Sequence, residues 1–108
     1  MEVKELEVFS EKTNSSIVRM SSRRFPGVVI QGDSLYTFFF EAMALVEALA
    51  NCEDEETFLT ALEMAERLET HLLHYEETLQ HHGISLPYFR DPARSPLKYA
   101  HRWGNNDS

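Results

Sequence analysis

The 108 residues of this chain are enough for one hydrophobic core and too few for two independent ones, so we expect a single domain. Hydrophobic residues make up 43% and charged residues 26% of the chain, which is close to the globular average and excludes wholesale disorder. The formal net charge of −8 repels phosphate backbones and anionic lipid headgroups. We therefore expect neither nucleic acid nor a membrane as a partner, and a basic protein is the better electrostatic match.

The cysteine content and the N-terminal sequence indicate in which cellular compartment we expect the protein. The single cysteine, Cys52, cannot form a disulfide within the chain. No apolar run follows a basic start, as it does in a secretion signal. We expect a cytoplasmic protein.

The charge is distributed unevenly along the chain. Residues 1–83 carry 16 acidic and 6 basic side chains, whereas residues 84–108 carry 2 acidic and 4 basic ones. We expect an α+β domain over residues 1–89 and a proline-containing tail over residues 90–108. We expect the tail to dock in part on the acidic body.

Three strands are predicted before the first helix. Residues 5–8 alternate polar and apolar side chains, which is typical of a strand with one wet face, and we interpret residues 17–20 in the same way. Residues 11–15 supply turn-forming side chains between them. Residues 28–31 begin with three consecutive β-branched side chains, which is typical of a more buried strand. The simplest arrangement is a three-stranded antiparallel β-meander.

A first helix is predicted from Gly32-Asp33-Ser34 to about Asn51, with Asp33 or Ser34 accepting a hydrogen bond from the free amides of the first turn. Apolar side chains cover most of its circumference, so it is either sandwiched between the sheet and a second helix or covers an interface. From this surplus we predict a homodimer. The expected core positions are Leu35, Phe38, Phe39, Ala42, Leu45, Val46 and Leu49.

A second helix is predicted to begin within residues 52–57 and to end at Gly83, the residue type that most often follows a helix C-terminus. Its apolar line has a three-then-four spacing, and Leu59, Leu62, Met64 and Leu73 lie outside that line. We predict two long antiparallel α-helices over the sheet, followed by an irregular tail. The line consists of Phe58, Ala61, Ala65, Leu68, Leu72, Tyr75 and Leu79.

Gly32-Asp33-Ser34-Leu35 matches the block that names the GDSL esterases, in which the serine is a nucleophile. That family requires an Asp-x-x-His further along the chain, whereas Asp91 is followed three residues later by Arg94. We interpret the block as a helix start, with no catalytic residue.

The histidines do not predict a metal site. His71 and His74 lie one turn apart on the second helix, but no acidic residue completes a zinc motif around them. We expect no metal and no cofactor.

Two basic groups have alternative interpretations. Arg23 and Arg24 precede a turn near the start of the first helix, where free amides attract anions, so that Arg23, Arg24 and Ser34 form an alternative anion-binding site. In the tail, basic residues recur every fourth position among aromatic side chains, a combination common in recognition surfaces; they are Arg90, Arg94, Lys98 and Arg102. Proline breaks this run, and we expect a short helical turn from Pro96 to Trp103, with Trp103 docked on the core.

An acidic ridge follows the second helix. It is either a solubilising face or a surface that attracts a basic partner. The residues expected to bind a partner are Glu55, Glu56, Glu63, Glu66 and Glu69.

The segment from Arg24 to Leu35, R-F-P-G-V-V-I-Q-G-D-S-L, resembles a segment of small, uncharacterised bacterial proteins. The resemblance implies a compact bacterial domain and no particular activity. Small acidic bacterial proteins of this build are often immunity proteins or antitoxins. We expect a non-enzymatic inhibitor of a basic toxin; the alternatives are a small enzyme or anion-binding domain that uses the Arg23-Arg24 loop, and an oligomeric accessory subunit.

Overall fold

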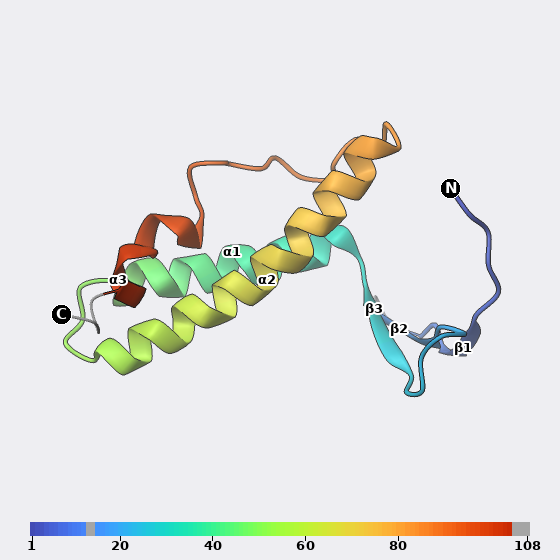
Figure 1. The fold of residues 1–108 in the computed structure, drawn as a ribbon, viewed down its shortest axis with the longest axis horizontal. Coiled ribbons are helices and arrows are strands. Elements are labelled where there is room, and N and C mark those ends of the chain that lie inside the picture. Colours follow the sequence, from blue (N-terminus) through green and yellow to red (C-terminus); the bar gives the residue numbers. More distant parts are fainter. Residues whose placement is uncertain (13–14, 105–108) are drawn as a thin grey trace.

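The structure, a computed structural model, describes residues 1–12 and 15–104, with the side chain of Trp103 outside this description. It has the predicted α+β order of three strands followed by two long helices (Figure 1). The elements are β1 (Glu7–Ser10), β2 (Ser15–Arg19), β3 (Gly27–Ile30), α1 (Gly32–Leu49), α2 (Glu55–His81), the short 3₁₀ helix η1 (Pro96–Tyr99) and α3 (His101–Gly104).

The three strands form the predicted antiparallel meander, in the order β1-β2-β3. Val8 pairs with Val18, and Ile17 pairs with Val28. A bulge between Val8 and Ser10 shifts the register of β1 by one residue.

The sheet does not cover the helices, and this expectation was wrong. It extends from the N-terminal end of α1 and lies beside the helical pair (Figure 1). The close packing in the described residues is that of α1 against α2, whereas the sheet has at most marginal contact with either helix. The predicted burial of the third strand was also wrong, because Val28, Val29 and Ile30 are all exposed. A β-branched run identifies a strand, but it does not show whether anything packs on that strand.

The start of α1 differs from the prediction in its cap. The N-cap residue is Gln31, whose side chain makes no capping bond. Asp33 accepts a hydrogen bond from the backbone amide of Ser34 at 2.9 Å, so it does serve one free amide of the first turn. Ser34 does not cap the helix, because it lies inside the first turn.

Both ends of α2 have clear local causes. Asp54 is the N-cap and accepts a hydrogen bond from the amide of Thr57 at 3.2 Å. At the other end Gly83 has a φ of 68°, and the amide of Ile84 donates to the carbonyl of Leu79 at 2.9 Å. This is a Schellman motif, in which glycine adopts the left-handed conformation at little cost.

The core lies between α1 and α2. Three residues differ from the prediction: Leu62, which lies outside the predicted line, is in the core, whereas Phe38 and Leu45, predicted core positions of α1, are about half exposed. Met43 on α1 is also buried. The difference arises because α1 has one neighbouring helix and no sheet above it. The fully or nearly fully buried residues are Phe39, Met43, Val46, Phe58, Ala61, Leu62, Ala65 and Leu72.

The tail runs back along the two helices toward the end where α1 connects to α2 (Figure 1). The predicted helical turn is present as η1 and α3. Docking of the Trp103 side chain lies outside the described residues. No helix in the described part of the chain has the length and apolar character needed to cross a membrane.

Candidate functional site

Three arginines of the tail contact the helical pair, and each lies beside a carboxylate and over a phenyl ring. We call these contacts the arginine sites: Arg90 with Glu69, Glu76 and Phe39; Arg94 with Glu47 and Phe40; and Arg102 with Glu55 and Phe58.

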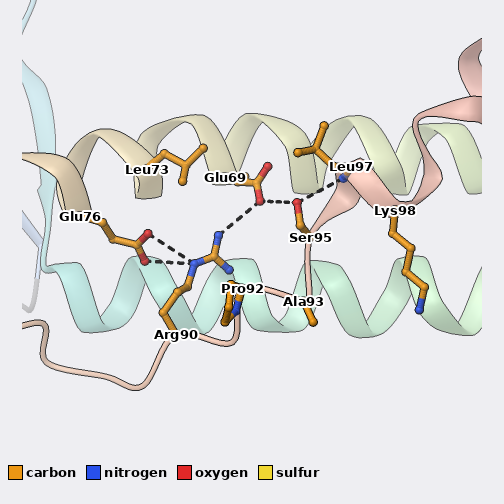
Figure 2. Close-up of a pocket in the computed structure, with 9 residues that line it drawn as sticks. All are labelled: Glu69, Leu73, Glu76, Arg90, Pro92, Ala93, Ser95, Leu97 and Lys98. Atoms are coloured by element: carbon orange, nitrogen blue, oxygen red, sulfur yellow. Dashed lines mark hydrogen bonds and ion pairs between the residues drawn. The ribbon is translucent and has the colours of Figure 1, made fainter.

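Figure 2 shows the Arg90 site. It is the most buried of the three. Nη2 of Arg90 lies 3.3 Å from Oε2 of Glu69, and Nε lies 3.1 Å from Oε2 of Glu76. The hydroxyl of Ser95 donates to Glu69 at 2.7 Å. The guanidinium carbon lies 4.7 Å from the centre of the buried Phe39 ring. Removing Arg90 would therefore leave the buried Glu69 without its counter-charge, which is strongly destabilising in general.

A pocket of about 510 Å³ lies between α2 and the tail beside this site. In Figure 2 the Glu69 and Glu76 side chains come from positions two turns apart on α2 and point toward Arg90. Ser95 also accepts a hydrogen bond from the amide of Leu97 at 3.2 Å and so caps η1. The pocket is thus bounded by groups that hold the tail in place.

Tyr88 extends the same network toward α1. Its hydroxyl donates to Glu76 at 2.8 Å, and its ring stacks on Tyr36 with the centroids 4.2 Å apart and the planes 8° apart. Burial, together with the hydrogen bond to Glu76, raises the pKa of Tyr88, so the phenol stays protonated and continues to donate at neutral pH.

The Arg94 site lies on α1. The guanidinium donates to both carboxylate oxygens of Glu47, at 2.9 and 2.8 Å, and its carbon lies 4.2 Å from the Phe40 ring centre. This bidentate geometry is specific to arginine. The hydrogen bond from Arg94 holds the pKa of Glu47 below its ordinary value of 4.5, although partial burial opposes the shift.

The Arg102 site lies where α1 connects to α2. Arg102 donates to the carboxylate of Glu55, and its Nη1 donates to the carbonyl of Ala50 at 2.9 Å. Its guanidinium carbon lies 3.9 Å from the centre of the Phe58 ring. The bond from Arg102 lowers the pKa of Glu55. The free carbonyl at the C-terminus of α1 thereby gains a charged donor, as helix C-termini favour.

The three arginine sites share one chemistry. A carboxylate fixes the planar guanidinium through hydrogen bonds, and the face of an aromatic ring attracts its positive charge. Lysine has a single rotatable ammonium group and cannot reproduce the two bonds in one plane. These sites therefore select arginine.

The glutamates of the predicted acidic ridge differ in their exposure and in their bonding partners. Glu69 is 9% exposed and is bonded to Arg90 and Ser95 of the tail, so it does not lie on an exposed face. Glu55 is bonded to Arg102, and Glu63 is paired with Arg67 one turn along α2. Glu56 and Glu63 are exposed, and Glu66 is partly buried.

The alternative anion-binding residues are not brought together by any described contact. Arg23 and Arg24 lie in the turn before β3, and the guanidinium of Arg24 lies 5.3 Å from the Phe25 ring centre. Ser34 lies in the first turn of α1. Among the described residues, no group of three or more His, Cys, Asp or Glu side chains is arranged to hold a metal ion.

The sequence contained a signal for Glu69 and Glu76 that the prediction did not use. An unbroken line with alternating four- and three-residue steps runs along α2 through positions 58, 62, 65, 69, 72 and 76. Four of these six positions are buried apolar residues, namely Phe58, Leu62, Ala65 and Leu72. Glutamates at two positions of such a line are placed against the packed face, where a carboxylate needs a partner.

The fold and the arginine sites define a small α+β domain with an exposed sheet, a two-helix body and a basic tail bound to that body. The chain belongs to the family of unknown function DUF6959, whose family model matches residues 1–88. Comparison with curated proteins and with solved structures gave no match. The match includes every carboxylate and ring of the arginine sites and ends before Arg90.

Proposed function

We propose that this chain is a non-enzymatic protein-binding domain whose two-helix body recognises an arginine-containing segment of a basic partner protein. The observation that carries the proposal is the repeated arrangement in which three arginines each lie between a carboxylate and a phenyl ring. In this proposal the tail is a ligand held in cis, and a partner's arginines take its place.

The charge of the helical body supports this proposal. Residues 32–83 carry 12 acidic and 1 basic side chains, so a basic segment is attracted before contact. The tail neutralises only part of this charge through its three arginines. A narrower form of the proposal is that the partner is a bacterial toxin and the chain its cytoplasmic inhibitor; it is supported by the net charge of −8, the single cysteine and the resemblance of residues 24–35.

A partner protein must displace the tail from the arginine sites, and this competition determines which contacts it must make. A segment in the same chain acts at an effective concentration of about millimolar for a short flexible link. A free peptide that offers the same contacts therefore binds poorly while the tail is in place. A partner must add contacts, such as those with the exposed Glu56 and Glu63.

The test removes the arginine from the two more exposed sites, those of Arg94 and Arg102. Arg90 is left in place because it balances a buried charge. The double variant Arg94→Gln, Arg102→Gln is compared with the wild type for binding of a synthetic peptide with the sequence of residues 91–102. We expect the dissociation constant to fall at least about tenfold in the double variant. Isothermal titration calorimetry measures the dissociation constant of the peptide for the wild type and for the double variant, and circular dichroism verifies the helical content of both proteins.

Two controls test whether the sites bind arginine selectively through their carboxylates. A peptide with lysine at the positions of Arg94 and Arg102 should bind more weakly, because it loses the bidentate bonds. Adding Glu47→Gln and Glu55→Gln to the double variant should abolish binding, whereas adding Glu77→Gln should leave it unchanged. Equal binding of both peptides, or no binding by a folded double variant, contradicts the proposal.

A further inference from the structure

The part of the tail that carries Arg94 is folded into a turn closed by Asp91. The amide of Arg94 donates to the carbonyl of Asp91 at 3.1 Å, and the amide of Ala93 donates to Oδ1 of Asp91 at 3.0 Å. Pro92 occupies the second position of this turn, where its fixed φ is favoured, and aspartate is favoured at the first position. The conformation around Arg94 is therefore stabilised by contacts within the tail itself.

A second proline turn follows directly and leads to Arg102. Pro96 is the first residue of η1, a position where proline is favoured because its missing amide is not needed there. The hydroxyl of Ser95 accepts from the amide of Leu97 and donates to Glu69, as Figure 2 shows. The residue that caps this turn is thus also bonded to the helical body.

The turns also set the distance between the two arginine sites that lie along α1. The guanidinium of Arg94 lies over Phe40, and Arg102 donates to the carbonyl of Ala50, the C-cap residue of α1. These two positions on α1 are ten residues apart, which is about 15 Å along a helix. The eight-residue step from Arg94 to Arg102 would cover about 27 Å if it were extended. The tail matches the shorter distance because η1 and α3 fold this stretch (Figure 1).

The place of Asp91 indicates that the turn matters as well as the charge. Residues 91–102 carry this one acidic side chain beside 3 basic ones, and they lie on a body whose residues 32–83 carry 12 acidic and 1 basic side chains. Asp91 and Glu47 line the same pocket of about 280 Å³ beside the Arg94 site. Charge alone disfavours a carboxylate at this position, whereas the turn uses that carboxylate as an acceptor.

We propose that the arginine sites select a partner segment by its fold as well as by its arginines. The segment has an arginine-bearing turn of the form Asp-Pro-x-Arg, followed by a serine-proline helical turn that carries a second arginine eight residues after the first. An arginine-rich segment without these turns must be ordered before it makes the same contacts, and this ordering costs free energy. The inference rests on the proposed function, since it concerns the same sites, and it identifies the partner as a turn-forming basic segment of a protein.

Peptides of residues 91–102 test the first turn on the double variant Arg94→Gln, Arg102→Gln, because a change in the peptide leaves the folding of the protein unaffected. Asp91→Ala and Asp91→Asn remove the same negative charge from the peptide, but only asparagine keeps a side-chain oxygen for the amide of Ala93. We expect the Asp91→Ala peptide to bind about fivefold more weakly than the Asp91→Asn peptide in isothermal titration calorimetry. Charge alone predicts the same affinity for both, and equal affinity overturns the proposal.

A further peptide breaks both turns without changing the composition, the net charge or the position of any arginine. It exchanges each proline with the residue that follows it, and so removes the two amides that donate to the side chains of Asp91 and Ser95. We expect it to bind at least about tenfold more weakly than the unchanged peptide. Equal binding of the two overturns the proposal and leaves the proposed function standing, whereas no binding of any peptide to the folded double variant contradicts both. The changes are Pro92→Ala, Ala93→Pro, Pro96→Leu and Leu97→Pro.

Discussion

Gly32 lies where α1 begins, directly against the ring of Tyr75 on α2. A Cβ atom at this position would lie 2.0 Å from Cζ of Tyr75, which is far too close for two carbon atoms that are not bonded to each other. The absence of a side chain at this residue therefore sets how closely the start of α1 approaches α2.

We predict that Gly32→Ala destabilises the protein by about 1–3 kcal/mol, because the Tyr75 ring must leave its site. Urea unfolding followed by circular dichroism measures the change. Gly27→Ala is the matched control, since nothing lies within 4 Å of a Cβ there. In a Tyr75→Ala background the cost of Gly32→Ala should disappear; an unchanged cost there would mean that the ring is not its cause.

Single residues also show where sequence reasoning reached its limit at the site. The basic tail and its docking on the acidic body follow from the uneven charge, but not which carboxylate meets which arginine. Glu69 is 21 residues from Arg90 and Glu47 is 47 residues from Arg94 in the chain. Such pairs depend on the path of the tail across the helices, which local patterns do not encode. Glu69 itself was predictable from its place on the buried line of α2.

At the scale of elements, an aspartate accepts a hydrogen bond from a free amide at the start of each long helix, but only Asp54 of α2 is the N-cap residue. Asp54 caps α2 by accepting from Thr57, and this hydrogen bonding also lowers the pKa of Asp54. Ser34 occupies the first turn of α1 and caps nothing.

We predict that Asp54→Ala costs about 1 kcal/mol in the free energy of unfolding, because one free amide of α2 loses its acceptor. Ser34→Ala is the matched control and should change stability little. Thermal unfolding of both variants at neutral pH measures the difference. A larger loss for Ser34→Ala than for Asp54→Ala would contradict the assignment of the caps.

Element boundaries were predictable because their causes are local. The left-handed glycine at position 83 ends α2, and turn-forming residues separate β1 from β2. The packing of the sheet was not predictable in the same way. Val28 and Val29 look like core residues in sequence, since hydrophobicity does not specify what covers a strand.

At the scale of the whole molecule, the arginine sites join the tail to both helices, so their protonation affects global stability. Glu47 and Glu55 have pKa values lowered below 4.5 by their bonds to Arg94 and Arg102. Each carboxyl group therefore favours the folded state fully at pH above 4.5. This stabilisation decreases as the pH falls through the lowered folded-state pKa values, because the unfolded chain then binds more protons.

We predict that the double variant Glu47→Gln, Glu55→Gln is less stable than the wild type at neutral pH and that the difference shrinks as the pH falls below 4.5. The variant has lost these bonds at every pH, whereas the wild type loses them only when its carboxylates are protonated. Urea unfolding at a series of pH values measures the difference in unfolding free energy. Glu77→Gln, which removes a similar exposed charge from α2, should show no such convergence. A difference that persists unchanged through acid would mean that the glutamates act by packing, because packing does not require their charge.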